Sequence, residues 1–259
     1  MDLAGATVIV TGSSSGIGAA CVRLLAAKGC NVVVNYARSA DAAAAVADEC
    51  RGLGAQAIAV RADVSNDADC RRLVAAAMDE WGRLDGLVNN AGTTKFCEHA
   101  DLDGLSAEDF HAIYAVNVVG PYQMSRAAAA VMERGAIVNI ASMAGVIGTG
   151  SSIAYAASKG ALNTMTLSLA RVLGPGIRVN AVCPGFVQGE WLRTGYGTER
   201  YDSIREQLTE VNPLGAPGKP EDMAEVAVWF LEGAGKVTGE VMMVDAGNHL
   251  VGRAPLKAR

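Results

Sequence analysis

The pattern of apolar positions divides the chain into short and long segments. Short runs rich in valine and isoleucine predict buried strands. They alternate with alanine-rich stretches whose apolar residues recur every three or four positions, which predicts amphipathic helices. The predicted strands are 7–10, 31–35, 56–61, 86–89, 136–140, 177–182 and 240–244. The predicted helices are 17–28, 40–51, 67–82, 107–133, 152–173 and 220–231.

This alternation predicts an α/β fold. About seven parallel strands would form one doubly wound, Rossmann-like sheet with helices on both faces, because right-handed crossovers carry the chain from strand to strand. No repeat or linker interrupts the pattern, so we expect a single domain over residues 1–259. The stretch 183–219 is rich in glycine and proline and predicts a long irregular segment. We expect residues 186–218 to form a flexible lid that selects the substrate.

Composition narrows the class of partner. Hydrophobic residues make up 51% of the chain and aromatic residues 5%, which suits strands covered on both faces. The net charge of −5 and a pI of about 5.3 provide no broad positive field, so we expect neither nucleic acid nor a membrane as partner. No signal-like or membrane-spanning run occurs, which favours a cytoplasmic location. The six cysteines form no C-x-x-C pair and the three histidines do not cluster with them, so we expect no metal and no disulfide.

A glycine-rich turn follows the first predicted strand. The residues Thr-Gly-Ser-Ser-Ser-Gly-Ile-Gly at 11–18 open directly into a helix, and such a turn lets backbone N–H groups approach a pyrophosphate at the positive end of the helix. Glycine turns also occur for packing alone, which is the alternative at this point. The predicted cofactor contacts in this turn are Gly12, Ser14, Ser15, Gly16, Ile17 and Gly18.

Further motifs follow the glycine turn in a fixed order. They are the G-x-x-x-G-x-G spacing itself, Asn89-Asn90-Ala91-Gly92 after the fourth strand, Asn117, Ser142, Tyr155-x-x-x-Lys159 and Pro184-Gly185. In this combination the chain resembles the short-chain dehydrogenase/reductase family over essentially its whole length. The resemblance implies a Rossmann-like fold, a nicotinamide cofactor and hydride transfer between that cofactor and a carbonyl or alcohol, with a tyrosine as general acid and base.

The end of the second predicted strand bears on the choice of cofactor. A carboxylate normally binds the adenosine ribose of NAD at this point, whereas here Arg38 and Ser39 can hydrogen-bond a 2′-phosphate. We therefore expect NADP(H) in preference to NAD(H); the alternative is that Arg38 is an ordinary surface residue. The family resemblance adds further cofactor contacts at Asp63, Val64, Asn90, Ala91, Gly92, Pro184, Gly185 and Val187, besides Tyr155 and Lys159.

The catalytic candidates lie on or beside one predicted helix. Tyr155 and Lys159 are four positions apart and share a helix face, so the ammonium is expected to lower the pKa of the phenol. Ser142 follows a strand at the carboxyl edge of the sheet, where its hydroxyl can orient the substrate oxygen. By resemblance, Lys159 also binds the nicotinamide ribose and Asn117 supports a water that relays protons. Taken singly, these residues could equally be a surface pair, a turn former and a helix cap.

Two features of the predicted lid remain open. Relatives often carry a threonine three residues after the glycine of Pro184-Gly185, whereas this chain has Gln188, which either binds the cofactor or faces solvent. The lid also carries an apolar group that either covers the substrate or packs within the lid or against another subunit. This group comprises Phe186, Trp191, Leu192 and Tyr196.

The substrate and the assembly are the least determined points. The segment Val-Asn-Tyr-Ala-Arg-Ser at 34–39 resembles reductases of 3-oxoacyl thioesters, with Arg126 and Arg134 as candidates to meet an acidic carrier. Sugar, small alcohol or ketone substrates are alternatives, and a non-catalytic dinucleotide sensor is an alternative of another class. We expect a homotetramer or homodimer that packs through 127–130 and the helix of Tyr155, or else these residues cover the sheet. The tail 247–259 either reaches a neighbouring subunit or is mobile.

Overall fold

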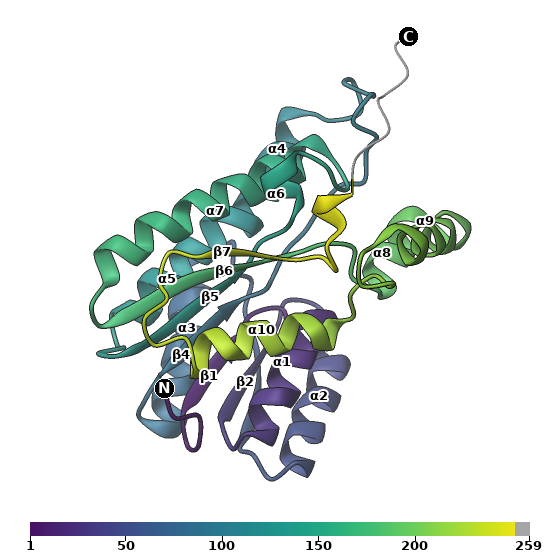
Figure 1. Cartoon of the computed structure of the whole chain (residues 1–259). Coiled ribbons are helices and arrows are strands. Elements are labelled where there is room, and N and C mark those ends of the chain that lie inside the picture. Colours follow the sequence, from purple (N-terminus) through teal and green to yellow (C-terminus); the bar gives the residue numbers. More distant parts are fainter. Residues whose placement is uncertain (252–259) are drawn as a thin grey trace.

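One parallel sheet with helices on both faces forms the molecule in a computed structural model that describes residues 1–251 (Figure 1). The predicted tail therefore lies partly outside the described residues. The seven strands are β1 (Thr7–Val10), β2 (Asn31–Tyr36), β3 (Ala57–Arg61), β4 (Gly86–Asn89), β5 (Gly135–Ile140), β6 (Ile177–Pro184) and β7 (Val241–Val244). Each lies within about two residues of a predicted strand, and the predicted fold class is confirmed.

The helices follow the same alternation. The main ones are α1 (Gly16–Ala27), α2 (Ala40–Gly52), α3 (Asp67–Trp81), α4 (Ala107–Tyr114), α5 (Gly120–Ala129), α7 (Ile153–Leu173) and α10 (Pro220–Glu232). Shorter or additional elements are the π-helix η1 (Ala115–Val119), α6 (Ala144–Ile147), α8 (Glu190–Tyr196), α9 (Thr198–Val211) and the 3-10 turn η2 (Asn248–Leu250).

The strand order determines where a ligand can bind at the edge of the sheet. The strands run in the order β3-β2-β1-β4-β5-β6-β7, and all neighbours are parallel. The chain winds outward from β1 in one direction and from β4 in the other. Because the two loops that leave β1 and β4 diverge there, a crevice opens outside the carboxyl ends of these strands, and ligands of doubly wound sheets bind at such a point.

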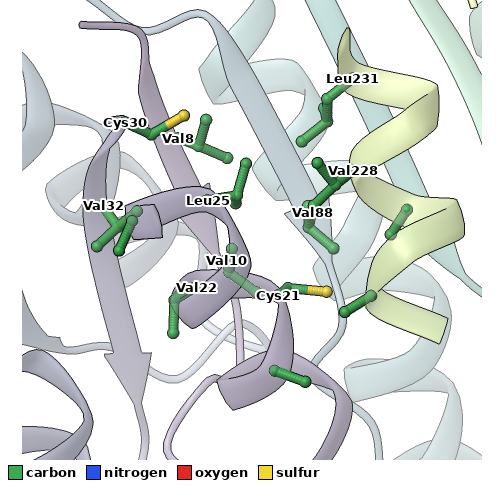
Figure 2. Close-up of a cluster of buried hydrophobic side chains, with 14 of the residues drawn as sticks. Val8, Val10, Cys21, Val22, Leu25, Cys30, Val32, Val88, Val228 and Leu231 are labelled. Atoms are coloured by element: carbon green, nitrogen blue, oxygen red, sulfur yellow. The ribbon is translucent and has the colours of Figure 1, made fainter. Parts of the chain in front are cut away.

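Two apolar layers hold the helices on the sheet. On one face α1, α2 and α10 cover the strands, and on the other α3, α5 and α7 do so. Figure 2 shows the first layer, whose members include Val8, Val10, Val32, Val88, Cys21, Val22, Leu25, Val228 and Leu231. Full burial of a side chain of this kind stabilises the fold by about 1.5–3 kcal/mol. All six cysteines are free thiols.

Two sequence expectations need correction. The predicted helix 107–133 ends at Ala129 and is interrupted by the π-helix η1, because the backbone widens by one residue around Asn117. The stretch 183–219 is not irregular, since α8 and α9 occupy most of it. Helix α9 is strongly polar and has one buried residue, Tyr201, so apolar periodicity did not reveal it. The glycines and prolines that suggested a loop lie largely at the helix ends.

Candidate active site

The glycine turn has no room for side chains at two positions. Gly12 has a φ of +62°, and a Cβ there would lie 2.9 Å from Ala91 Cα. A Cβ on Gly18 would lie 2.5 Å from Asn90 Nδ2. The turn is thus pressed against the segment that follows β4, and glycine is required for this close approach.

Hydrogen bonds fix the turn in place. Asn90 Nδ2 donates to the Thr11 and Gly12 carbonyls at 2.9 and 3.0 Å, and the backbone N–H of Ala91 donates to Thr11 Oγ1 at 3.0 Å. Asn89, the first residue of the same motif, is buried and donates to Asn139 Oδ1 at 2.9 Å. Asn89 is the last residue of β4 and Asn90 follows it, and the two neighbouring amides make different contacts.

The start of α1 is open. Ser15 occupies the N-cap position without a capping side-chain hydrogen bond, and the first turn carries no acidic residue. Ser14 and Ile17 are half-buried, whereas Ser15 and Gly16 are exposed. The first N–H groups of α1 are thus free of side-chain caps, and the turn leaves them accessible to an anion.

A charged hollow of about 340 Å³ lies at the ends of β2 and β3. Arg61 donates from Nε to the Ala37 carbonyl at 3.3 Å, and Arg72 is paired with Asp69 at 2.5 Å. Arg38 is exposed and has no ion pair within residues 1–251. The residues that line the hollow are Ala37, Arg38, Arg61, Asp63, Asp69 and Arg72.

Arg61 and Arg72 were not predicted as site residues. The parallel register pairs Arg61 with Tyr36, so the end of β3 lies beside the segment that carries Arg38, although 23 positions separate the two arginines in the sequence. Of the other predicted contacts here, Ser39 is the exposed N-cap residue of α2 and Asp63 is exposed at the rim. Val64 is buried, and its carbonyl accepts a hydrogen bond from Gln123 Nε2 at 2.9 Å.

Tyr155 lies in the first turn of α7, close to Ser142. Ser152 caps the helix by accepting a hydrogen bond from the Tyr155 backbone N–H at 3.2 Å, which fixes the start of α7. Tyr155 is 8% exposed. Burial raises the pKa of Tyr155 to about 12, and hydrogen bonding with the Ser142 side chain opposes this rise. The phenol therefore keeps its proton at neutral pH.

Lys159 is buried beneath Tyr155. Its Nζ donates to the Ile140 carbonyl at 2.7 Å and lies 5.7 Å from the centroid of the Tyr155 ring. Burial lowers the pKa of Lys159 from 10.5 to about 8. The expectation that Lys159 lowers the pKa of Tyr155 is not met, because burial raises that pKa. Both side chains are desolvated, which disfavours the charged form of each.

Asn117 lies on the π-helix and is fully buried. Its Oδ1 accepts a hydrogen bond from the Thr93 N–H at 2.8 Å, and its Nδ2 donates to the Thr93 carbonyl at 2.9 Å and to Ser158 Oγ at 3.0 Å. The amide thus fixes the chain just after Gly92. A Cβ on Gly92 would lie 3.7 Å from Lys159 Nζ, so this segment adjoins the lysine. The π-turn gives Asn117 this orientation, and π-turns are frequent at functional sites.

A close contact between α6 and α7, which the sequence analysis did not predict, holds α7 in position. A Cβ on Gly145 of α6 would lie 2.4 Å from the backbone carbon of Lys159 and 2.5 Å from the backbone nitrogen of Gly160. Only a glycine allows α6, which directly follows the Ser142 segment, to approach α7 so closely. This contact couples the position of Ser142 to that of Lys159.

The segment after β6 adopts a defined course. Gly185 packs against Asp245, where a Cβ would lie 2.6 Å from Asp245 Cβ, and Val187 forms an isolated bridge with Gly218. Gln188 is half-buried, and its Nε2 donates a hydrogen bond to the Pro217 carbonyl at 3.1 Å. It joins the two ends of the 186–218 segment.

The apolar residues of this segment separate into two groups. Trp191 lies beside Tyr155, with ring centroids 5.9 Å apart, and Tyr196 packs on Phe96 at 5.0 Å. Phe186 instead packs on Tyr201, at 5.3 Å, within the base of the segment. Phe96 follows β4 and was not predicted, because only the tertiary fold brings it to α8.

Comparison with known proteins identifies the family. Residues 12–249 match the sequence family described as Enoyl-(Acyl carrier protein) reductase. A protein of Streptomyces violaceoruber, named as ketoacyl reductase 2 of the granaticin polyketide synthase, is 44% identical over 250 residues, which are 94% of this chain and 96% of that protein. The chain belongs to the short-chain dehydrogenase/reductase family. It is therefore an oxidoreductase, as the motifs predicted.

Solved short-chain dehydrogenase/reductase structures agree. One from Burkholderia xenovorans superposes with a TM-score of 0.88 at 40% identity and covers 95% of this chain and 98% of its own. A blue fluorescent protein from a metagenomic library, solved in complex with NADPH, has a TM-score of 0.85 at 34% identity, with coverage of 95% and 99%. Within residues 1–251, none of the helices has the length and hydropathy needed to cross a membrane.

Proposed function

We propose that this short-chain dehydrogenase/reductase reduces a ketone with NADPH, and that Tyr155 supplies the proton. One observation carries the proposal: Tyr155, Lys159 and Ser142 meet at the carboxyl edge of the sheet, beside the glycine turn of α1. A sensor that only bound a dinucleotide would not need a phenol and an ammonium buried together there. Consumption of NADPH in the presence of a panel of ketones and 3-oxoacyl thioesters tests the proposal.

Each side chain of the proposed site has its own chemical role. The Ser142 and Tyr155 hydroxyls donate hydrogen bonds to the carbonyl oxygen and orient it. NADPH, when bound, supplies the hydride to the carbonyl carbon. As negative charge develops on the oxygen, Tyr155 transfers its hydroxyl proton to it, and the charge of Lys159 stabilises the phenolate that remains. The same residues act in reverse for oxidation of an alcohol.

The residues present fit a phosphorylated dinucleotide. The glycine turn from Gly12 to Gly18 offers uncapped helix N–H groups to a pyrophosphate, and the hollow at the other end carries Arg38 without a competing carboxylate partner. We propose that Arg38 and Ser39 hold the 2′-phosphate and that Arg61 adds a second guanidinium. The relative solved with NADPH supports this preference.

Replacement of Arg38 tests the cofactor preference. Arg38→Ala should raise KM for NADPH about tenfold and leave KM for NADH unchanged, since a charged hydrogen bond to the 2′-phosphate is lost. Arg23→Ala, which removes an arginine on α1 that is paired with Glu49 on α2, is the matched control. Equal KM values for NADPH and NADH in the wild-type protein would refute the preference.

Lys159 sets a pH limit for reduction. Its pKa is lowered by burial to about 8, so the ammonium loses its proton from about pH 8 upward, whereas the raised pKa of Tyr155 keeps the phenol protonated across this range. We expect kcat/KM for reduction to be level below pH 8 and to fall about tenfold per pH unit above it. A profile that stays level to pH 10 would contradict the role of Lys159.

Membership of the family does not by itself specify a substrate, so we propose the substrate class. The similarity to a ketoacyl reductase favours a 3-oxoacyl thioester or a related ketone. Arg126, a candidate for binding an acidic carrier, is paired with Asp67 and lies over the Tyr122 ring, so it is not free for that role. We propose that the lid, residues 186–218, and the neighbouring segment after β4 select the substrate.

We also propose a homo-oligomer that packs through α5 and α7. Ala127 and Ala128 are buried and cover the sheet, which was the alternative given for 127–130, whereas Ala130 is exposed. Ala157 is exposed, as are Tyr122 on α5 and Leu167 on α7. An apolar face of this kind suits a symmetric contact between helices. Light scattering of the purified protein measures the oligomeric state.

A further inference from the structure

Three aromatic rings continue outward from the catalytic tyrosine as one surface. Trp191 of α8 lies 5.9 Å from the Tyr155 ring at an angle of 56°, Phe96 lies 6.2 Å from Trp191, and Tyr196 lies 5.0 Å from Phe96. We call Phe96, Trp191 and Tyr196 the aromatic wall. They come from the segment after β4 and from α8, which are about 95 positions apart in the sequence.

The aromatic wall is fixed in place by its surroundings. A Cβ on Gly195 would fall within the Phe96 ring, 1.9 Å from Cζ, so the ring rests directly on the α8 backbone. Arg200 of α9 lies over the Tyr196 ring at 5.1 Å and is ion-paired with Glu98. Ring contact, cation–π contact and an ion pair therefore join the segment after β4 to α8 and α9. A ligand that binds beside the aromatic wall meets a surface that is already formed.

The wall borders free space and carries little uncompensated charge. A hollow of about 240 Å³ lies beside it, lined by Phe96, Cys97, Glu98, Gly150, Ser151, Gly195, Tyr196 and Arg200. The two charged residues on this lining, Glu98 and Arg200, are paired with each other. Trp191 is 51% exposed although it adjoins a buried catalytic residue. A large aromatic surface left open at this point is suited to cover an apolar group of a ligand.

From these observations we infer that the substrate is a ketone whose carbonyl carries a flat aromatic ring, and that Trp191 and Phe96 select it by stacking. The inference rests on the proposed ketone reduction. With the carbonyl oxygen at Tyr155 and Ser142, a substituent on the carbonyl carbon reaches Trp191 first, because its ring is the nearest part of the wall. A ring there gains contact with an aromatic face, whereas a sugar would have to desolvate hydroxyl groups against it.

The test compares two ketones of similar size that differ in the ring. Acetophenone has a flat aromatic ring and cyclohexyl methyl ketone a puckered aliphatic one, and fructose serves as a keto sugar. Each variant is described by its ratio of kcat/KM for the two ring ketones, so that intrinsic reactivity cancels between variants. Trp191→Ala and Phe96→Leu should each lower the ratio of aromatic to aliphatic turnover about two- to twelvefold, since aromatic pairs gain about 0.5–1.5 kcal/mol beyond burial.

Controls separate this inference from the proposed function. Trp191→Phe should keep most of the wild-type ratio, and Trp229→Ala, at an exposed tryptophan on α10, should leave it unchanged. An unchanged ratio in Trp191→Ala, or fructose reduced faster than acetophenone by the wild type, would overturn the inference while ketone reduction stands. Failure of the wild type to reduce any ketone, with NADPH bound in a fluorescence titration, would instead refute the proposed function and with it this inference.

Discussion

Tyr155→Phe is expected to lower kcat for ketone reduction about 10²–10⁴-fold, the usual contribution of a positioned general acid. The variant loses only the hydroxyl that donates the proton, while Ser142 can still hydrogen-bond the carbonyl oxygen. The ring that contacts Trp191 also remains, so substrate binding should change little. Stopped-flow or steady-state nicotinamide absorbance measures the rate, and NADPH fluorescence measures cofactor affinity, which should stay within about twofold.

The matched control is Tyr122→Phe, which removes a hydroxyl from an exposed tyrosine on α5 and should retain full activity. If Tyr155→Phe kept more than about a tenth of the wild-type rate, another group would have to supply the proton. The proposed role of Tyr155 would then be wrong, although the family assignment would be unaffected.

Lys159→Met should lower kcat/KM about 10²–10³-fold, comparable with the loss of one preorganised donor at a developing negative charge. Methionine fills a similar volume without charge, so the phenolate formed on Tyr155 loses the ammonium that lies 5.7 Å from its ring. The decline of activity above pH 8 should disappear in the same variant, because the group that titrates there is gone. A purely structural role would lower activity and leave the shape of the pH profile unchanged.

The fold itself should survive this change. Lys159 is buried and makes one hydrogen bond, to the Ile140 carbonyl, so removal of its charge also removes a desolvation cost. A thermal unfolding midpoint close to that of the wild type verifies this, with Lys28→Met at the exposed end of α1 as the control. An activity loss accompanied by a pH profile identical to the wild type would contradict the proposed mechanism.

The sequence alone predicted the features that depend on the spacing between nearby residues. The four-residue interval between Tyr155 and Lys159, and the position of Ser142 just after a strand, place these residues correctly because helix and strand geometry fixes them. The seven strands were predictable for a related reason, since both faces of each central strand are covered and most of its residues are apolar.

Long-range contacts explain what the sequence did not reveal. Phe96 joins the aromatic wall only through the approach of α8 to the segment after β4, and Arg61 reaches Arg38 only through the pairing of β2 with β3. The π-turn at Asn117 has no apolar periodicity of its own and lies within an otherwise helical pattern. Likewise, the ammonium of Lys159 was expected to lower the pKa of Tyr155, whereas burial, which tertiary packing sets, raises this pKa.

Isotope transfer from the cofactor tests the central claim most directly. NADPH is prepared with deuterium at C4 of the nicotinamide in each of its two stereochemical forms, and the alcohol formed from acetophenone is analysed by mass spectrometry. The proposed mechanism predicts that one of the two forms places a single deuterium on the carbinol carbon and that Tyr155→Phe suppresses formation of this product. Alcohol that forms without deuterium from either labelled cofactor would contradict hydride transfer at this site.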